Sequence, residues 1–349
     1  MLEKERLYKF DNIRFILIFS VVFGHFLELF LDDPIALVLY KIIYSFHMPV
    51  FIFLTGYFAK FNIKRVFSQL IVPFFIFQTL YLIFDFYVIK NSNRFTLQYM
   101  TPYWILWYLF ATIVYYFFIP ILKRGNVFFG WSVTVVSVAW ALLSGFNDDF
   151  GYYLSLARIF TFLPFFIVGW YFGNTNLFDG IRSFVKNRKK ICLFISALGM
   201  IASFGLILCF FRITPSMLYG SCSYLKANYT MWHRVVFMAV AVFSGVFLYI
   251  VVPEKRIFGV STVGKNTYYI FILHGFLLRF IQETNLFSIM PYGKFSLALV
   301  LTVGILALFG NDLVYKICNL LFTGRGMVHM VKHTYSFIKE KINRKSRPN

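Results

Sequence analysis

Acidic side chains and long polar segments are both scarce in this sequence. The 349 residues include 14 Asp and Glu against 34 Lys and Arg, and 60% of all residues are hydrophobic. An ordinary soluble domain of this size does not have such a composition. The short polar segments also leave no room for a separate soluble catalytic domain. We therefore expect a protein that crosses a lipid bilayer several times.

Cysteine is also sparse, and its four occurrences are far apart in the chain, at Cys192, Cys209, Cys222 and Cys318. This spacing predicts neither a disulfide framework nor a zinc site, and we expect no metal cofactor. No signal peptide is expected either, because the first apolar run is too long and contains Arg14 and His25. We interpret that run as a retained membrane span.

About ten apolar stretches are long enough to cross a bilayer, which takes roughly 20 apolar residues. They lie near residues 13–31, 36–58, 66–89, 104–122, 128–144, 156–172, 190–211, 233–252, 266–284 and 295–314. Most Lys and Arg residues fall in alternate connections, which the positive-inside rule assigns to the cytoplasm. The sequence thus predicts an all-α, polytopic membrane protein with both termini cytoplasmic. Because the net charge of +20 gathers beside the membrane, we expect a lipid bilayer and no nucleic acid as partner.

The C-terminal segment has a different pattern, so we divide the chain into a membrane domain, 1–323, and a basic tail, 324–349. An apolar stripe with helical spacing follows Gly326 and comprises Val328, Val331, Tyr335, Ile338 and Ile342. Such a stripe is typical of an amphipathic helix on the inner leaflet. His329 and His333 are four residues apart but lack a third ligand, which favours a solvated face over a metal site.

Two histidines lie inside the first two predicted spans, His25 in one and His47 in the other. Arg14 precedes His25 by eleven residues, and eleven helical steps return to within about 20° of the starting direction. We therefore expect Arg14 and His25 on one face, with the two imidazoles near the middle of the bilayer. Ionisable groups at this depth are costly and mark functional sites. The alternative is a pair of histidines that only pack between helices.

The first span carries further polar residues on the same stripe, namely Asp11, Glu28 and Asp32. Arg14 is placed to hold a phosphate-bearing ligand, and His25 is placed to move a proton. Glu28 lies one turn beyond His25. It either orients that imidazole, meets the acceptor or is an ordinary interfacial carboxylate.

Four further residues are candidates for substrate binding. Trp107 and Tyr108 open the fourth span and Arg158 opens the sixth, so we assign them to the acceptor, although an aromatic belt would also explain the first two. His274 lies in the cytoplasmic half of the ninth span, where a donor could reach it. Packing is the alternative for His274. The segments between spans on the outer side are rich in Tyr, Trp, Asn and Ser, which suits a sugar.

Several segments together resemble the acyltransferase-3 family of membrane O-acyltransferases, especially its fucose 4-O-acetylase-like branch. They are Asp11-Asn-Ile-Arg14, Gly24-His25, Phe46-His47-Met-Pro49, Phe53-Leu-Thr-Gly56-Tyr-Phe58, Arg65 with Pro73, Leu106-Trp107-Tyr108-Leu109, Phe162-Leu-Pro-Phe-Phe-Ile-Val-Gly169, Gly264-Lys-Asn-Thr and Leu273-His274. The resemblance implies ten spans, acyl-CoA as cytoplasmic donor and an extracytoplasmic carbohydrate as acceptor. It also implies functional roles for the motif residues His25 and Arg14 and for the loop residue Arg65.

These observations predict an O-acyltransferase of the plasma membrane. We expect it to move an acyl group, in the first instance acetyl from acetyl-CoA, to a hydroxyl of a cell-surface polysaccharide or its lipid-linked precursor. His25 would be the base, His47 its partner or a second proton carrier, and Arg14 and Arg65 would hold the CoA phosphates. The alternative from another class is a transporter or flippase for a polar glycan lipid, which would use the same polar stripe without chemistry.

Overall fold

The computed structural model describes residues 7–90, 95–210, 215–290, 292–329 and 332. This part of the chain is mainly helical and contains no β-strand, which confirms the predicted all-α class. Its helices are α1 (Tyr8–Leu27), α2 (Pro34–Phe58), α3 (Ile63–Val66), α4 (Val72–Phe84), α5 (Trp107–Leu122), α6 (Val127–Leu143), α7 (Leu156–Asn174), α8 (Asp179–Asn187), α9 (Lys189–Gly205), α10 (Pro215–Leu218), α11 (Met231–Val251), α12 (Val260–Lys265), α13 (Thr267–Glu283), α14 (Leu286–Ile289), α15 (Lys294–Phe309) and α16 (Asp312–Phe322).

Eight helical segments of the described chain are long and apolar enough to cross a membrane. A ninth results if α15 and α16 together form one span. Helix α13, where the ninth span was predicted, has 17 residues, fewer than the roughly 20 that a perpendicular span needs. A multi-span membrane protein is therefore confirmed, while the count of ten and the cytoplasmic placement of both termini stay predictions.

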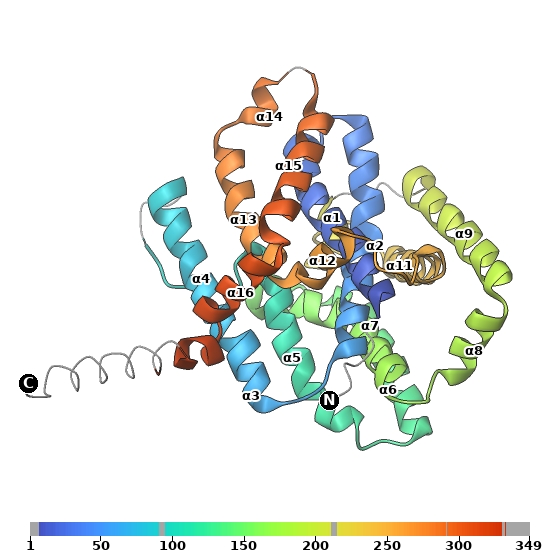
Figure 1. Ribbon diagram of the computed structural model, residues 1–349. Helices are drawn as coiled ribbons and strands as arrows, with labels where there is room; N and C mark the ends of the chain where they lie inside the picture. Colours follow the sequence, from blue (N-terminus) through green and yellow to red (C-terminus); the bar gives the residue numbers. More distant parts are fainter. Residues whose placement is uncertain (1–6, 91–94, 211–214, 291, 330–331, 333–349) are drawn as a thin grey trace, which may run out of the picture.

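The last predicted span, 295–314, covers α15 and the start of a second helix, α16. Helix α15 ends at Phe309, and α16 leaves it at an angle of 65° (Figure 1). The break has a local cause, because the side chain of Asn311 accepts the backbone N–H of Val314 and so caps a new helix. Asn311 is a favourable N-cap residue, but it lies between two apolar stretches, so the sequence pattern is that of one continuous span.

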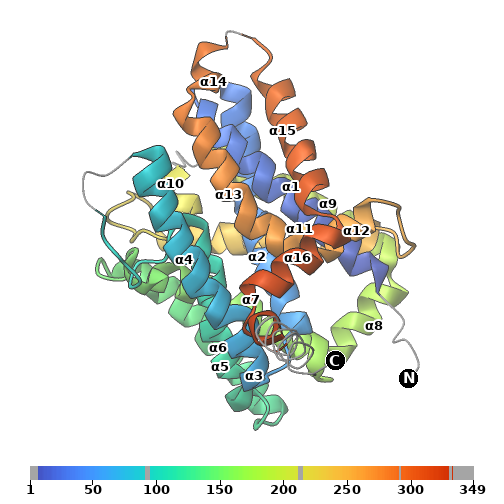
Figure 2. The ribbon, with the colours of Figure 1, turned by 60° about the vertical axis from the view of Figure 1, so that its left-hand side comes forward.

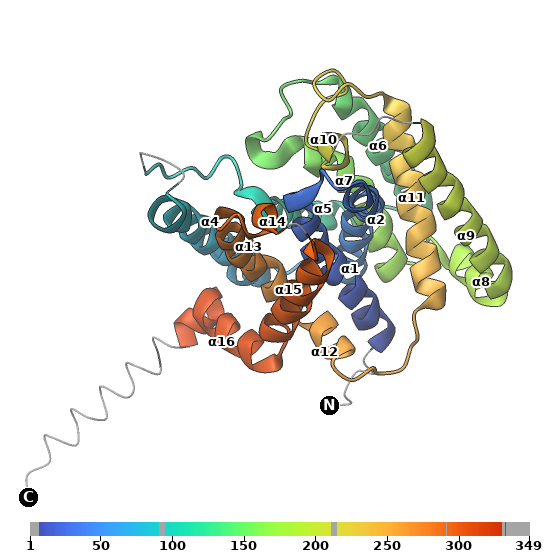
Figure 3. The same ribbon diagram turned by 90° about the horizontal axis from the view of Figure 1, so that it is seen from above.

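Helix α1 lies at the centre of the bundle. It contacts α2, α12, α13 and α15, while α2 contacts α7 and α11 (Figures 1 and 2). Helices α9 and α11 run side by side at the rim, as the view from above shows (Figure 3). Polar side chains on α1 are therefore enclosed by protein, as expected for a polar stripe in a membrane helix.

Glycines bring α2 and α7 into direct backbone contact. A Cβ atom on Gly56 would collide with the carbonyl oxygen of Phe166, and one on Gly169 would collide with that of Phe53. Small residues at such positions let helices in a membrane approach closely, and the resulting packing replaces the hydrophobic driving force that lipid removes. This contact fixes α2, which carries His47, against α7, which carries Arg158.

Gly169→Ala should therefore destabilise the protein by about 1–3 kcal/mol, the usual cost of overpacking a close contact. Gly304→Ala is the matched control, since Gly304 lies inside α15 and a Cβ there has nothing within 4 Å. The control should be neutral or slightly stabilising, because alanine is the better helix former. Thermal unfolding of the two detergent-solubilised variants, followed by size-exclusion chromatography, compares them. Equal midpoints would contradict the close contact.

The described part of the tail is helical from residue 324 to 329. The backbone N–H of Arg325 donates to the Ser68 hydroxyl at 2.8 Å, so the tail begins in contact with the membrane domain. Val328 of the predicted apolar stripe is exposed. The rest of that stripe and His333 lie outside the described residues, and the division of the chain at residue 324 stays a prediction.

Candidate active site

The carboxylate of Glu28 is the centre of a hydrogen-bonded cluster. Three phenol hydroxyls donate to its Oε1 atom, from Tyr40 at 3.2 Å, Tyr44 at 2.9 Å and Tyr219 at 2.8 Å. Its Oε2 atom lies 3.3 Å from Nδ1 of His25. Hydrogen bonds from several donors stabilise a negative charge away from bulk water. Glu28 is therefore part of the polar site and not an ordinary interfacial carboxylate.

Helical spacing explains most of this cluster. Glu28 opens the 3₁₀ turn Glu28–Phe30 that continues α1, and it lies three positions after His25. Tyr40 and Tyr44 are four residues apart on α2 and so share one face. Tyr219 comes from the segment after α10, far away in the sequence. Burial, together with the nearby charge of Glu28, raises the pKa of the Tyr219 hydroxyl, so this group stays protonated and donates at neutral pH.

The contacts of His25 determine which ring nitrogen is basic. The Tyr44 hydroxyl, which donates to Glu28, also lies 2.8 Å from Nδ1 of His25. Because the Tyr44 hydroxyl gives its proton to Glu28, its oxygen can accept a hydrogen bond from Nδ1. The ionised carboxylate of Glu28, the other neighbour of Nδ1, can only accept. The proton of the neutral ring is therefore placed on Nδ1, and Nε2 is the basic nitrogen. Within the described chain, no residue makes a hydrogen bond to Nε2.

The imidazole that stacks on His25 is that of His274, not that of His47. The rings of His25 and His274 are 5.4 Å apart between centroids, and Trp104 touches His25 from another side at 4.7 Å. His274 is buried and donates through Nδ1 to the Ile270 carbonyl oxygen at 3.0 Å. Its Nε2 atom is buried without a hydrogen-bond partner among the described residues. With Nδ1 donating, Nε2 of the neutral ring is an acceptor without a donor.

His47 reaches the cluster through an intermediate ring. Its Nδ1 donates to the carbonyl oxygen of Ile43 at 2.7 Å, and its ring contacts Tyr44 at 4.8 Å. Tyr44 in turn contacts His25. His47 thus reaches His25 through Tyr44, and its role as a partner of His25 stays a prediction.

The two arginines predicted to hold the donor have different surroundings. Arg14 lies 3.4 Å from Asp11 Oδ1, with its guanidinium 4.4 Å from the centre of the Phe58 ring. Arg65 donates to the side chain of Gln69 and lines a pocket of about 200 Å³. The other residues lining this pocket are Val66, Gln69, Leu70, Tyr116, Tyr268, Tyr315, Asn319 and Thr323. The pocket combines a cation with three aromatic side chains, which suits a nucleotide fragment.

The three residues predicted to bind the acceptor separate into two places. Trp107 faces the guanidinium of Arg158 at 5.1 Å, so these two lie together. Tyr108 instead shares a hydrogen bond of 2.6 Å with Thr55 of α2 and packs on the rings of Phe51 and Phe271. These contacts give Tyr108 a packing role between α2, α5 and α13, beside any role in binding.

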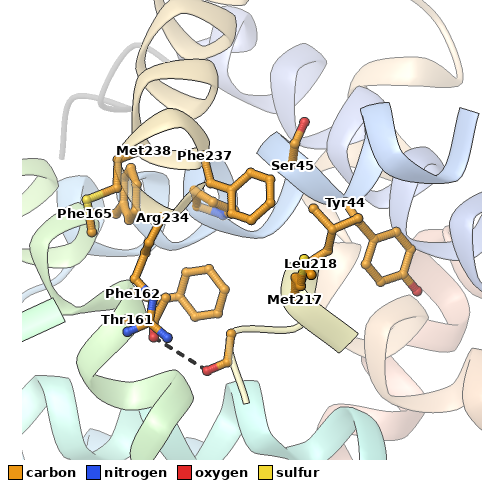
Figure 4. Close-up of a pocket in the computed structure, with 12 residues that line it drawn as sticks. Tyr44, Ser45, Thr161, Phe162, Phe165, Met217, Leu218, Arg234, Phe237 and Met238 are labelled. Carbon is orange, nitrogen blue, oxygen red and sulfur yellow. Dashed lines mark hydrogen bonds between the residues drawn. The ribbon is translucent and has the colours of Figure 1, made fainter. Parts of the chain in front are cut away.

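A smaller pocket lies between Tyr44 and Arg234 (Figure 4). Its volume of about 30 Å³ is close to the share of one water molecule in the liquid. Phe162, Phe237 and Met238 make its wall largely apolar. It therefore cannot admit a sugar as it stands.

Sequence reasoning missed four residues of this site. Tyr40 and Tyr44 have a detectable signal, since they lie on the same face of one span and precede His47 by seven and three residues. Trp104 was part of the aromatic group at the start of α5 but was not singled out. Tyr219 has no such signal, because its contact with Glu28 joins residues 191 positions apart.

The sequence matches the family model described as an acyltransferase domain, that of the acyltransferase-3 family, over residues 7–311. The match includes most of the chain, with His25, Glu28, Arg65, Arg158 and His274 among the matched residues, and the chain belongs to this family of membrane acyltransferases. The resemblance to the family is thereby confirmed, while the fucose 4-O-acetylase-like branch stays a prediction. Neither a curated protein nor a solved structure matches the chain.

Proposed function

We propose that the protein transfers an acetyl group from acetyl-CoA, arriving from the cytoplasmic side, to a hydroxyl of an extracytoplasmic glycan or of its lipid-linked precursor, in the plasma membrane. The observation that carries the proposal is the pair formed by Glu28 and His25. The carboxylate of Glu28 binds Nδ1 of His25. Nε2 of His25 is then the nitrogen that can act as a base inside the membrane bundle. Family membership supports the class of reaction, and the acetyl group, donor and acceptor are our inference.

The reaction needs one proton to be taken up and returned. Nε2 of His25 removes the proton from the acceptor hydroxyl while its oxygen attacks the thioester carbonyl carbon. The carbon–sulfur bond then breaks, and the imidazolium returns the proton to the departing CoA thiolate. The products are the O-acyl glycan and free CoA. Glu28 stabilises the imidazolium between these two steps, as the carboxylate of a catalytic triad does.

Of the three histidines inside the bundle, His25 fits the role of base best. The Nδ1 atoms of His47 and His274 contact neutral backbone carbonyls, whereas that of His25 contacts a carboxylate. A negative charge stabilises an imidazolium more than a neutral carbonyl does. We assign another role to Nε2 of His274, which has no partner among the described residues. It would accept a hydrogen bond from an N–H or O–H group of a substrate beside His25.

The pocket at Arg65 supports an acyl-CoA donor. Its volume of about 200 Å³ is below the range typical for drug-sized ligands, so it accommodates one part of CoA and not the whole molecule. Tyr116 lines this pocket together with Arg65, and Arg14 lies eleven residues before His25 on α1. We assign the CoA phosphates to these two arginines.

The decisive experiment compares cells with and without the protein. Surface glycans and lipid-linked precursors are isolated and analysed by mass spectrometry after growth with isotope-labelled acetate. A labelled acetyl ester that depends on the protein and disappears in His25→Ala supports the proposal. If the protein instead changed glycan export without adding a labelled acetyl ester, and His25→Ala did not affect that change, the result would support a transporter or flippase.

Arg14→Ala should raise the KM for acetyl-CoA by about 10- to 100-fold, because a charged hydrogen bond to phosphate is lost. The KM for the acceptor should change little. Arg14→Lys should recover part of the loss, since lysine keeps the charge without the planar fork. Steady-state kinetics on protein in nanodiscs measure both constants, and Lys190→Ala, an exposed residue of α9, is the control. An unchanged KM for acetyl-CoA would remove Arg14 from the donor site.

A further inference from the structure

Two arginines are buried beside the segment that carries Tyr219. Arg158 of α7 is 8% exposed and Arg234 of α11 is 3% exposed. In the described part of the chain, neither forms an ion pair with a carboxylate. A buried charge is costly unless hydrogen bonds or an opposite charge compensate it. For each arginine we therefore ask which groups compensate its charge. The contacts of the two side chains differ in this respect.

Both terminal nitrogens of Arg234 donate hydrogen bonds within the protein itself. Its Nη1 donates to the Ala141 carbonyl oxygen at 2.6 Å and to the Ser144 hydroxyl at 3.1 Å. Its Nη2 donates to the Tyr229 hydroxyl at 2.6 Å and lies 3.5 Å from the Cys222 carbonyl oxygen. Arg234 thus ties α6 and the segment before α11 together, and this role explains its burial.

Arg158 is not compensated in this way. Its Nε donates to the Tyr219 carbonyl oxygen at 3.3 Å, but among the described residues none accepts a hydrogen bond from Nη1 or Nη2. Its guanidinium lies over two aromatic rings, 5.1 Å from the centroid of Trp107 and 5.4 Å from that of Tyr152. Aromatic faces attract a cation but leave its N–H groups unpaired. The unpaired pair of nitrogens matches the two oxygens of a carboxylate or phosphate.

Two sets of contacts relate Arg158 to the proposed base. Tyr219 contacts Arg158 with its carbonyl oxygen and Glu28 with its hydroxyl, so one tyrosine spans the distance between them. Trp104, in the 3₁₀ turn before α5, contacts His25, and Trp107, the first residue of α5, contacts Arg158. Arg158 and His25 are therefore connected both through Tyr219 and through this pair of tryptophans.

We propose that the acceptor is an anionic glycan, and that Arg158 binds its carboxylate or phosphate while His25 deprotonates the hydroxyl to be acylated. Trp107 and Tyr152 would then flank the bound group. The proposal deepens the function proposed above and rests on it. A carboxylate would come from an acidic sugar, and a phosphate would come from a lipid-linked precursor or a phosphorylated glycan.

The first test is the structure of the acylated glycan from the comparison of cells with and without the protein. Tandem mass spectrometry should find a carboxylate or a phosphate on the acylated sugar or on its direct neighbour, and the mass difference tells the two apart. A neutral glycan with a protein-dependent acyl ester would overturn the anionic acceptor and leave the acyltransferase intact. Absence of any protein-dependent ester would count against the proposed function instead.

The second test uses Arg158→Met and two forms of one acceptor, the deacylated native glycan and the same glycan with its anionic group reduced or removed. We expect Arg158→Met to raise the KM for the native acceptor by about 10- to 100-fold and to leave the KM for acetyl-CoA unchanged. The neutral acceptor should react equally with both proteins, and Arg158→Lys should recover part of the preference. An equal loss on both acceptors would show a structural role only and overturn the proposal.

A binding measurement decides the role of Arg158 without acyl transfer. Purified full-length protein in nanodiscs is titrated with an oligosaccharide of hexuronic acid, its carboxyl-reduced form and inorganic phosphate, and tryptophan fluorescence is recorded. At least one anion should change the fluorescence of the wild type, and Arg158→Met should abolish that change. A wild type that responds to neither anion, or a variant that responds like the wild type, would contradict anion binding at Arg158.

Discussion

His25→Gln should lower the rate of acyl transfer per folded molecule by about 10²- to 10⁴-fold, the usual contribution of a positioned general base. Glutamine keeps a polar group of similar size beside Glu28 and Tyr44, so the cluster can still form hydrogen bonds. Its amide cannot take up the proton of the acceptor hydroxyl. The loss should therefore appear in kcat, while the KM values for both substrates change little.

The packing alternative makes the opposite prediction for the same variant. If His25 only joined helices, glutamine would largely preserve activity, and His25→Ala would lower the yield of folded protein instead. Acyl transfer by both variants is measured on equal amounts of monodisperse protein in nanodiscs. His329→Gln is the control, because His329 is exposed in the helical segment after α16. A glutamine variant within a few-fold of the wild type would end the assignment of His25 as base.

Helical spacing made much of this site predictable from the sequence. Residues three positions apart on one helix are neighbours, and this rule already places Glu28 next to His25. The bilayer adds a second constraint, because a polar stripe on an apolar helix must face protein or water. The central position of α1 follows from this constraint.

The contacts between distant segments were not predictable in this way. Tyr219 and His274 reach the cluster from other elements, and no periodicity in α1 or α2 indicates which helix will lie opposite. His47 lies at a matched depth in the neighbouring helix and was the natural choice as partner, yet the ring of Tyr44 lies between His47 and His25. Depth in the membrane is readable from the sequence, whereas the rotation of one helix about another depends on packing. The close contact at Gly169 is one such packing determinant.

The arrangement around Glu28 also connects the proposed base with the segment that carries Tyr219. The phenols of Tyr40, Tyr44 and Tyr219 occupy one carboxylate oxygen, and His25 faces the other. Tyr219 belongs to the segment that also contacts Arg158, the residue that we propose for the acceptor. Hydrogen bonds thus connect His25 through Glu28 with the segment that contacts Arg158.

Glu28→Gln should lower kcat by about 10³-fold, with the KM for acetyl-CoA unchanged, because the neutral amide cannot stabilise the imidazolium of His25 and can hold the ring in the wrong tautomer. The three tyrosine hydroxyls can still donate to the amide oxygen, so the fold should persist. Glu28→Asp keeps the charge but shortens the side chain and should recover only part of the rate. Glu283→Gln, which alters an exposed carboxylate at the end of α13, is the matched control and should keep full activity. Single-turnover acyl transfer, recorded with thermal unfolding of each variant, separates the chemical step from folding. A Glu28→Gln variant that transfers acetyl groups at the wild-type rate would show that the carboxylate only packs against its tyrosines.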